Sequence, residues 1–315
     1  MLKIERYLQD SLRRFIVGAV FPLALAALVV IGFTGPAQSA QEHAKEPTAD
    51  DLVQTQLLSD VGAVAPGSTF HIAVRYRIAP HWHIYWNNPG DSGVAPGISI
   101  EAPEGFEVGN ILWPRPQVFR GKDEVTYGYE KEVLLIVPVK APEQIQEPTV
   151  TFEVALDWLV CKKVCLMGMR EQELKLDVTL KGRMIPAPGT ASREVSTWLG
   201  RMPAPMSKIK SATARLEQSN LLLAGPAGAS RPALFYPEET PGVTLQAAGP
   251  VKGTVVNGRY AFNIPLKIEP ENALGKPLRV AGIVVLGPDK GGRAIRIDIP
   301  VPAKDVAEAN ETSSE

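Results

Sequence analysis

Short apolar runs with a two-residue period, separated by glycine and proline, constrain the fold of this chain more than any other feature. The clearest run is TFHIAVRYRI, at residues 69–78. Its two faces differ: one carries Phe70, Ile72, Val74, Tyr76 and Ile78, and the other His71, Arg75 and Arg77. This alternation predicts a β-strand with one buried face. Residues 133–139, 150–159 and 174–180 repeat it. The 28 prolines and 27 glycines between such runs predict β-sandwiches.

The pattern changes between residues 182 and 206, and this change predicts a domain boundary. GRMIPAPG indicates a linker, and SREVSTWLGRM predicts one short helix. A second β block follows over residues 207–303, in which residues 278–286 form a nearly continuous apolar strand. The first β domain is predicted over residues 50–181. The polar tail, residues 304–315, is predicted to be disordered.

The N-terminal segment, residues 1–40, is predicted to be a targeting signal. Arg13 and Arg14 precede an apolar run at residues 15–33, and Ala37 and Ser39 fit a small-x-small cleavage rule. If the segment is not cleaved, it would serve as an inner-membrane anchor. Either way, the rest of the protein is expected outside the cytoplasm.

The charge pattern argues against several classes of function. The formal net charge is -1, and the sequence has no basic stripe, so no nucleic-acid partner is expected. No G-x-S-x-G, H-E-x-x-H or P-loop motif occurs. Asp91 lies in NPGDSG, which predicts a turn rather than a catalytic acid. The tryptophans at 82, 86, 113 and 158 are expected to fill a core rather than bind sugar.

The only two cysteines, Cys161 and Cys165, are four positions apart. In an exported protein they suggest a disulfide, either structural or redox-active. A five-residue loop would stabilise the fold by only about 2 kcal/mol, which favours a redox role. A short loop lets one sulfur quickly resolve a mixed disulfide formed on the other. Lys162 and Lys163 within the loop should favour thiolate.

A metal site is the alternative interpretation of this pair. Met167 and Met169 follow the cysteines, and His81 and His83 lie upstream. Cysteine and methionine sulfurs are soft ligands suited to Cu(I). The alternative set is therefore Cys161 and Cys165 with the two methionines, in a Cu(I)-binding or adaptor protein without redox turnover.

Three segments together resemble the periplasmic N-terminal domain of DsbD-type thiol:disulfide interchange proteins, and especially the ScsB-like branch. They are HWHIYWNNPGDSGVAP, WPRPQVFRGKDEVTYGYEKEVLLIVPV and LDWLVCKKVCLMG. The second β block resembles a further sandwich domain of that branch. The resemblance implies an all-β fold of two immunoglobulin-like sandwiches, joined by a short linker with one helix and preceded by the N-terminal signal or anchor. The best-known members space the cysteines by five residues rather than three.

The resemblance also implies a function and a site. The domain would take electrons from a membrane-embedded thiol reductase and reduce periplasmic thioredoxin-like or isomerase proteins, as a protein-disulfide reductase. The context would be cytochrome c maturation, disulfide isomerisation or copper stress. No cofactor is expected beyond the redox-active disulfide, and the electron supply would be a separate membrane protein. Catalysis is expected at Cys161 and Cys165, with Cys165 attacking first. The residues expected to shield or flank the site are Phe119, Arg120, His83, Tyr85, Trp158, Lys162 and Lys163.

Overall fold

The computed structural model describes residues 46–122, 124–179, 187–217, 219–230, 232–245, 249–269, 277–288 and 292–303. The predicted signal segment and tail lie outside these ranges, as do residues 180–181 of the first domain and residues 182–186 of the boundary region. No helix within the described ranges has the length and apolar character needed to cross a membrane. The described residues all belong to one compact unit.

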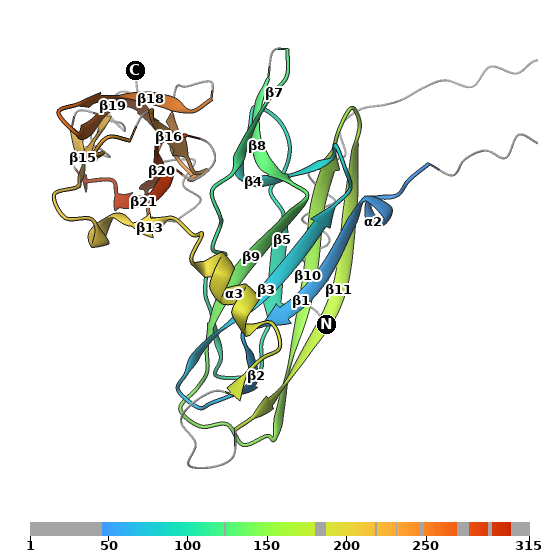
Figure 1. Cartoon of the computed structure of the whole chain (residues 1–315). Coiled ribbons are helices and arrows are strands. Elements are labelled where there is room, and N and C mark those ends of the chain that lie inside the picture. Colours follow the sequence, from blue (N-terminus) through green and yellow to red (C-terminus); the bar gives the residue numbers. More distant parts are fainter. Residues whose placement is uncertain are drawn as a thin grey trace, which may run out of the picture. The chain divides into compact units, whose positions relative to one another are not determined.

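The first β body contains two sheets (Figure 1). The strand order of one sheet is β1 (Val53–Ser59), β3 (Thr69–Ile78), β9 (Glu132–Lys140) and β6 (Glu107–Val108). The order of the other is β12 (Ala187–Pro188), β2 (Val61–Val64), β11 (Cys165–Val178), β10 (Thr149–Cys161), β4 (His83–Gly90), β8 (Val125–Glu130) and β7 (Gln117–Arg120), with β5 (Gly97–Glu101) paired to β10.

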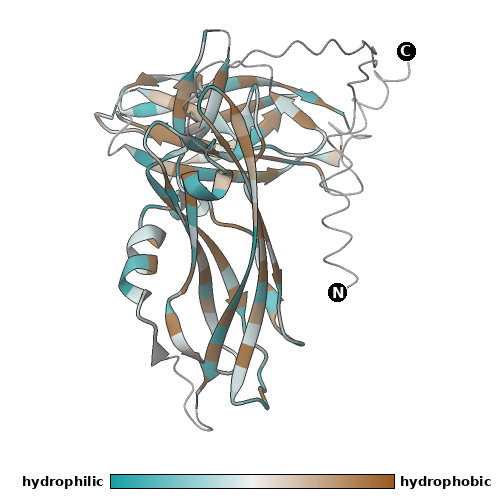
Figure 2. Ribbon diagram, turned by 90° about the vertical axis from the view of Figure 1, so that its right-hand side faces the viewer, coloured by the Kyte–Doolittle hydropathy of each residue, from teal (hydrophilic) through white to brown (hydrophobic). Residues whose placement is uncertain are grey.

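The core of this body is built from the alternating faces that the sequence predicts. On β3, Phe70 and Tyr76 are fully buried, and on β10 so are Phe152 and Trp158. Edge-to-face ring contacts join the two strands, with centroids 5.8 Å apart for Phe70 and Phe152 and 6.2 Å apart for Tyr76 and Trp158. Figure 2 shows apolar and polar residues alternating along the long strands. The two-residue period therefore sets which face of each strand is buried.

Two short helices flank this body. The predicted helix is present as α3 (Ser192–Leu199), and its Val195 packs in a small core with Ala73 and Leu134, on the face of β3 and β9 away from the main core. A second helix, α2 (Ala49–Leu52), was not predicted; it is a single turn that begins with a capping box between Thr48 and Asp51. The T-x-x-D spacing of that box was the available signal.

The second β body follows α3 and forms one sheet path. Its order is β13 (Ala204–Pro205), β21 (Arg293–Pro300), β20 (Arg279–Leu286), β16 (Ala233–Pro237), β18 (Val251–Val256), β19 (Arg259–Ile268), β15 (Asn220–Pro226) and β14 (Thr213–Glu217). β17 (Val243–Leu245) pairs with β19, and a 3-10 turn occupies Met206–Lys208. Every residue of β20 after Arg279 is buried, as expected for a continuous apolar strand covered on both faces.

These observations confirm the coarse fold prediction. Among the described residues, three sheets form two β bodies with a short helix between them. The fold is mostly β, and the cysteine pair lies on the first body.

Candidate functional site

Cys161 and Cys165 form a disulfide at the tip of the long β10–β11 hairpin. They are a directly opposed cross-strand pair, and their Cα atoms are 4.2 Å apart. The Lys162 amide donates to the Val164 carbonyl at 3.1 Å and closes the turn between them. The strand pairing therefore brings the two sulfurs together.

The two cysteines differ in accessibility. Cys161 is the last residue of β10 and only 3% exposed, whereas Cys165 is the first residue of β11 and is exposed. Cys161 has a second neighbour strand, because it lies opposite His83 of β4. Among the described residues, β11 pairs on its other side only near its far end, with β2 at Asp177 and Val178. An attacking thiolate therefore has an open approach to Cys165 rather than to Cys161.

Aromatic rings lie beside the buried cysteine. His83 stacks on Phe119 of β7, with ring centroids 4.5 Å apart and an interplanar angle of 19°. The His83 ring also meets Tyr85 edge to face at 5.2 Å. Phe119 reaches this position because β7 pairs with β8 and β8 pairs with β4. The structure thus brings together three of the residues that were expected to flank the site.

A turn holds these rings in place. Gly93, with a φ of +106°, lies against Tyr85, and a Cβ atom at this position would lie 2.2 Å from Tyr85 Cε1. Asp91 Oδ2 accepts a hydrogen bond from the Val125 amide at 2.7 Å, which ties the same turn to the start of β8. Asp91 therefore has the turn role that the sequence predicts, and nearby Ser92 donates to Glu124 at 3.0 Å.

Burial controls the charge of the aromatic groups. It lowers the pKa of His83 below its usual value of 6.5, although nearby Glu130 opposes this effect. The imidazole is therefore neutral at neutral pH. Burial, with a further contribution from Glu124, raises the pKa of the Tyr85 phenol. The fixed positive charges nearest in sequence to the disulfide are Lys162 and Lys163, which are both exposed.

Two of the predicted flanking residues lie elsewhere. Trp158 is 1% exposed and lies in the core, on the face of β10 opposite to that of Cys161. Its indole fills the space left by Gly168, where a Cβ would lie 2.3 Å from Trp158 Cε2. Arg120 is exposed and shares the face of β7 opposite to that of Phe119. The buried position of Trp158 agrees with the expectation that the tryptophans fill a core, whereas its expected position beside the disulfide is not observed.

The open side of the hairpin carries three exposed apolar side chains beside the exposed Lys162 and Lys163. Val164 is 62% exposed, Met167 44% and Met169 51%. They make up half of the six large exposed hydrophobic residues in the described part of the chain. Met167 and Met169 share the face of Cys165 because they follow it at intervals of two. Apolar side chains gathered in this way typically mark a site of protein contact.

The described residues contain no group of three or more His, Cys, Asp or Glu side chains that could hold a metal ion. His81 adopts a left-handed backbone conformation with a φ of 68° and is exposed in the turn before β4. His83 is stacked on Phe119. A metal site at the hairpin would therefore depend on sulfur ligands.

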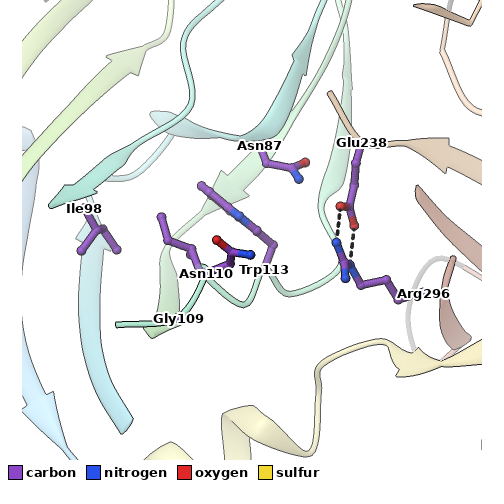
Figure 3. Close-up of a pocket in the computed structure, with 8 residues that line it drawn as sticks. Asn87, Ile98, Gly109, Asn110, Trp113, Glu238 and Arg296 are labelled. Carbon is purple, nitrogen blue, oxygen red and sulfur yellow. Dashed lines mark hydrogen bonds and ion pairs between the residues drawn. The ribbon is translucent and has the colours of Figure 1, made fainter. Parts of the chain in front are cut away.

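A pocket of about 420 Å³ has a lining that includes neither cysteine (Figure 3). Its lining residues are Asn87, Ile98, Gly109, Asn110, Ile111, Trp113, Glu238 and Arg296. Arg296 and Glu238 pair with each other: Arg296 Nε donates to Glu238 Oε1 at 3.0 Å, and Arg296 Nη2 donates to Glu238 Oε2 at 2.9 Å. Because this carboxylate and this guanidinium satisfy each other, the pocket offers no free charge for a reaction.

The fold and the hairpin tip define a β domain that carries an accessible disulfide. Residues 50–177 match the family described as thiol:disulfide interchange protein DsbD, N-terminal. The resemblance noted in the sequence is thereby confirmed.

Solved structures give a fold comparison. The chain is similar to the N-terminal periplasmic domain of ScsB from Proteus mirabilis, with a TM-score of 0.53 and 21% identity over 80% of this chain and 95% of that one. A protein of unknown function from Porphyromonas gingivalis W83 has a TM-score of only 0.22 and 10% identity, over 79% of this chain and 99% of that one. No curated protein matches the sequence.

Proposed function

We propose that this protein is a periplasmic thiol–disulfide exchange protein, a protein-disulfide reductase in class. It would pass electrons from a membrane-embedded thiol reductase to oxidised periplasmic proteins. The observation that carries the proposal is the Cys161–Cys165 disulfide at a hairpin tip, with Cys165 exposed and Cys161 buried. The family match over residues 50–177 supports it. An immunoglobulin-like topology for each β body is part of the same proposal.

Reduction of the Cys161–Cys165 disulfide by the membrane reductase would proceed in two exchange steps. A thiolate of the reductase attacks Cys165 Sγ, forms an intermolecular disulfide and releases Cys161 as a thiolate. The second thiolate of the reductase then attacks the reductase sulfur that is bonded to Cys165 Sγ, and Cys165 leaves as a thiolate. The reductase is left as a disulfide, and the cysteine pair has gained two electrons and takes up two protons.

Delivery to the substrate reverses this order. The Cys165 thiolate attacks one sulfur of the partner disulfide, and the other partner sulfur leaves as a thiolate. The Cys161 thiolate then attacks Cys165 Sγ, re-forms the Cys161–Cys165 disulfide and expels the first partner sulfur. The partner gains two electrons and two protons. Exposure of Cys165 and burial of Cys161 suit these two roles.

The surroundings of the disulfide support selective exchange with proteins. Phe119, held against His83, places an aromatic ring beside the buried cysteine and limits approach from that side. On the other side, Val164, Met167 and Met169 form an exposed apolar surface next to Cys165. A partner would dock on this surface, and thioredoxin-like or isomerase proteins of cytochrome c maturation, disulfide isomerisation or copper stress are the expected partners.

The test is a redox titration in dithiothreitol buffers, followed by exchange with an oxidised thioredoxin as the probe protein. We expect one reversible two-electron transition and transfer to the probe. Cys161→Ser should accumulate a mixed disulfide through Cys165, whereas the matched Cys165→Ser variant should not. If the pair shows no reversible transition at any accessible potential, the proposed function is wrong.

Cu(I) binding without redox turnover is a second candidate, favoured by one observation. Met167 and Met169 are exposed on the same strand face as Cys165, so soft sulfur ligands line that face. The test is an anaerobic Cu(I) titration of the reduced protein against a chromogenic chelator. Met167→Leu and Met169→Leu should weaken binding, and Met206→Leu in the second body is the control. Failure of the protein to compete with the chelator would remove this candidate.

A further inference from the structure

The two faces of strands β16 and β20 in the second body contribute to different hydrophobic cores. One face, with Phe235, Val284 and Leu286, belongs to the core of the second body. The other face, with Tyr236, Ile283 and Val285, belongs to the main core cluster of the first body. Those last three side chains are at most 1% exposed. The second body is therefore packed on the first through a buried sheet face.

The β7–β8 hairpin of the first body also has two faces. In its register, Val118 lies opposite Tyr127, and Phe119 lies opposite Thr126. Because side chains alternate along a strand, Val118, Arg120, Val125 and Tyr127 share one face, and Phe119 and Thr126 share the other. Phe119 meets His83 beside the disulfide. The opposite face of the hairpin is the face that meets the second body.

Contacts with the second body occur along that opposite face. The Tyr127 and Tyr236 rings meet edge to face with centroids 5.8 Å apart. A Cβ atom placed on Gly249 would lie 3.4 Å from Val125 Cγ1 and 3.8 Å from Arg120 Nη1. The hairpin thus has the second body on one side and the ring beside Cys161 on the other.

Two segments next to the hairpin are also held to the second body: the residues just before β7, and β4, which pairs with β8. Arg115, just before β7, donates to the Pro288 carbonyl at 3.4 Å, and its guanidinium lies 5.8 Å from the centre of the Tyr236 ring. Asn88 of β4 donates through Nδ2 to the Pro237 carbonyl at 2.8 Å. Both of these segments are direct neighbours of the aromatic group around His83.

We propose that the second β body braces the β7–β8 hairpin and so controls how readily Phe119 moves away from the disulfide. Tyr236 is the positioning residue, and it acts through Phe119 rather than by touching either cysteine. The physical reason is packing. Tyr127 of the hairpin is packed against Tyr236 of the second body, so a movement of the hairpin that carries Phe119 away from the disulfide must disrupt this contact. The inference rests on the proposed exchange function and assigns a role to the second body.

The experiment measures the rate at which dithiothreitol reduces Cys161–Cys165 in the full chain. Attack at the exposed Cys165 expels the Cys161 thiolate, which lies beside His83 and Phe119, so freer movement of Phe119 should ease its departure and raise the rate. Because an edge-to-face aromatic pair contributes a modest free energy, Tyr236→Ala should raise this rate by about twofold to tenfold. Tyr236→Leu keeps an apolar side chain in place but removes the aromatic ring, and it should also raise the rate of reduction. Val256→Ala, at an exposed position of the second body, is the control and should leave the rate unchanged.

A double-mutant cycle separates a brace from a general loss of stability. Phe119→Ala should raise the rate by itself, and adding Tyr236→Ala to it should have no further effect. Thermal unfolding of every variant checks that the fold persists at the assay temperature. Wild-type reduction rates in both Tyr236 variants would overturn the proposal. It would also be overturned if Tyr236→Ala raised the rate by the same factor in the wild type and in Phe119→Ala.

The two proposals can fail separately. If the brace is wrong, the dithiothreitol rates do not respond to Tyr236, while exchange with the oxidised probe protein continues. If the exchange function is wrong, the probe protein is not reduced, while the dithiothreitol rates still report the coupling between Tyr236 and Phe119.

Discussion

His83 of β4, the residue that pairs with Cys161 of β10, stacks on Phe119 of β7 with ring centroids 4.5 Å apart. Two strands that are distant in sequence thus place a neutral aromatic stack on one side of the disulfide. The other side of the hairpin tip is open at Cys165. This asymmetry underlies the following predictions about reactivity.

Alkylation should distinguish the two cysteines. In Cys161→Ser, the remaining Cys165 thiol is exposed and should react readily with iodoacetamide. In Cys165→Ser, the remaining Cys161 is buried beside His83, so it should react more slowly at the same pH. Mass spectrometry of timed samples measures both rates. Equal rates would contradict the assignment of Cys165 as the attacking residue.

The exposed methionines should matter for protein partners and not for small thiols. Met167→Ser combined with Met169→Ser removes apolar surface beside Cys165. We expect slower exchange with an oxidised thioredoxin, an unchanged rate of reduction by dithiothreitol and a stability change within about 0.5 kcal/mol. Val256→Ser, which alters an exposed apolar residue of the second body, is the matched control. A parallel loss of both rates would show that the substitutions disturb the disulfide itself.

Reduction of the disulfide should cost little stability. The loop it closes is only five residues long, so the loss in free energy of unfolding should be about 2 kcal/mol or less. Urea unfolding of the oxidised and reduced protein measures the difference. A much larger loss would favour a structural disulfide, because the reduced form would then be a poor intermediate for electron transfer.

Gly168→Ala should destabilise the first body by about 1–3 kcal/mol, because the added methyl overlaps the Trp158 indole. Gly121→Ala is the matched control, since its Cβ would meet its nearest neighbour, Glu124 Cβ, at an ordinary 3.6 Å. Denaturant unfolding compares both variants with the wild type. A neutral Gly168→Ala would mean that Trp158 can repack without cost.

Protonation of His83 should link stability to pH. Burial lowers its pKa in the folded protein below the unfolded value of 6.5, with Glu130 opposing the effect. Below pH 6.5 the unfolded state therefore binds more protons than the folded state, and stability falls as the pH falls from 6.5 towards the folded pKa. The contribution is fully present above pH 6.5. Melting temperatures between pH 7.5 and 5 measure it, and His83→Gln should flatten the slope.

The local strand pattern could be predicted well from the sequence, while the arrangement around the site could not. Alternation over residues 69–78 and 150–159 indicated which side chains are buried, and the short cysteine spacing placed both sulfurs at a turn. The family resemblance implied that Trp158 flanks the disulfide, whereas the structure has it on the core face beneath Gly168. Arg120 likewise lies on the hairpin face opposite to that of Phe119.

The sequence by itself determined the β class of the fold, the helix between the two β bodies and the closeness of the two sulfurs, because burial periodicity and a short loop are local properties of a chain. Only the tertiary structure decided that Phe119 meets His83, that Cys165 rather than Cys161 is open, and that Tyr236 lies behind Tyr127. These relationships depend on register and packing between distant strands. Such pairings are selected by the free energy of the whole core, so no single segment encodes them.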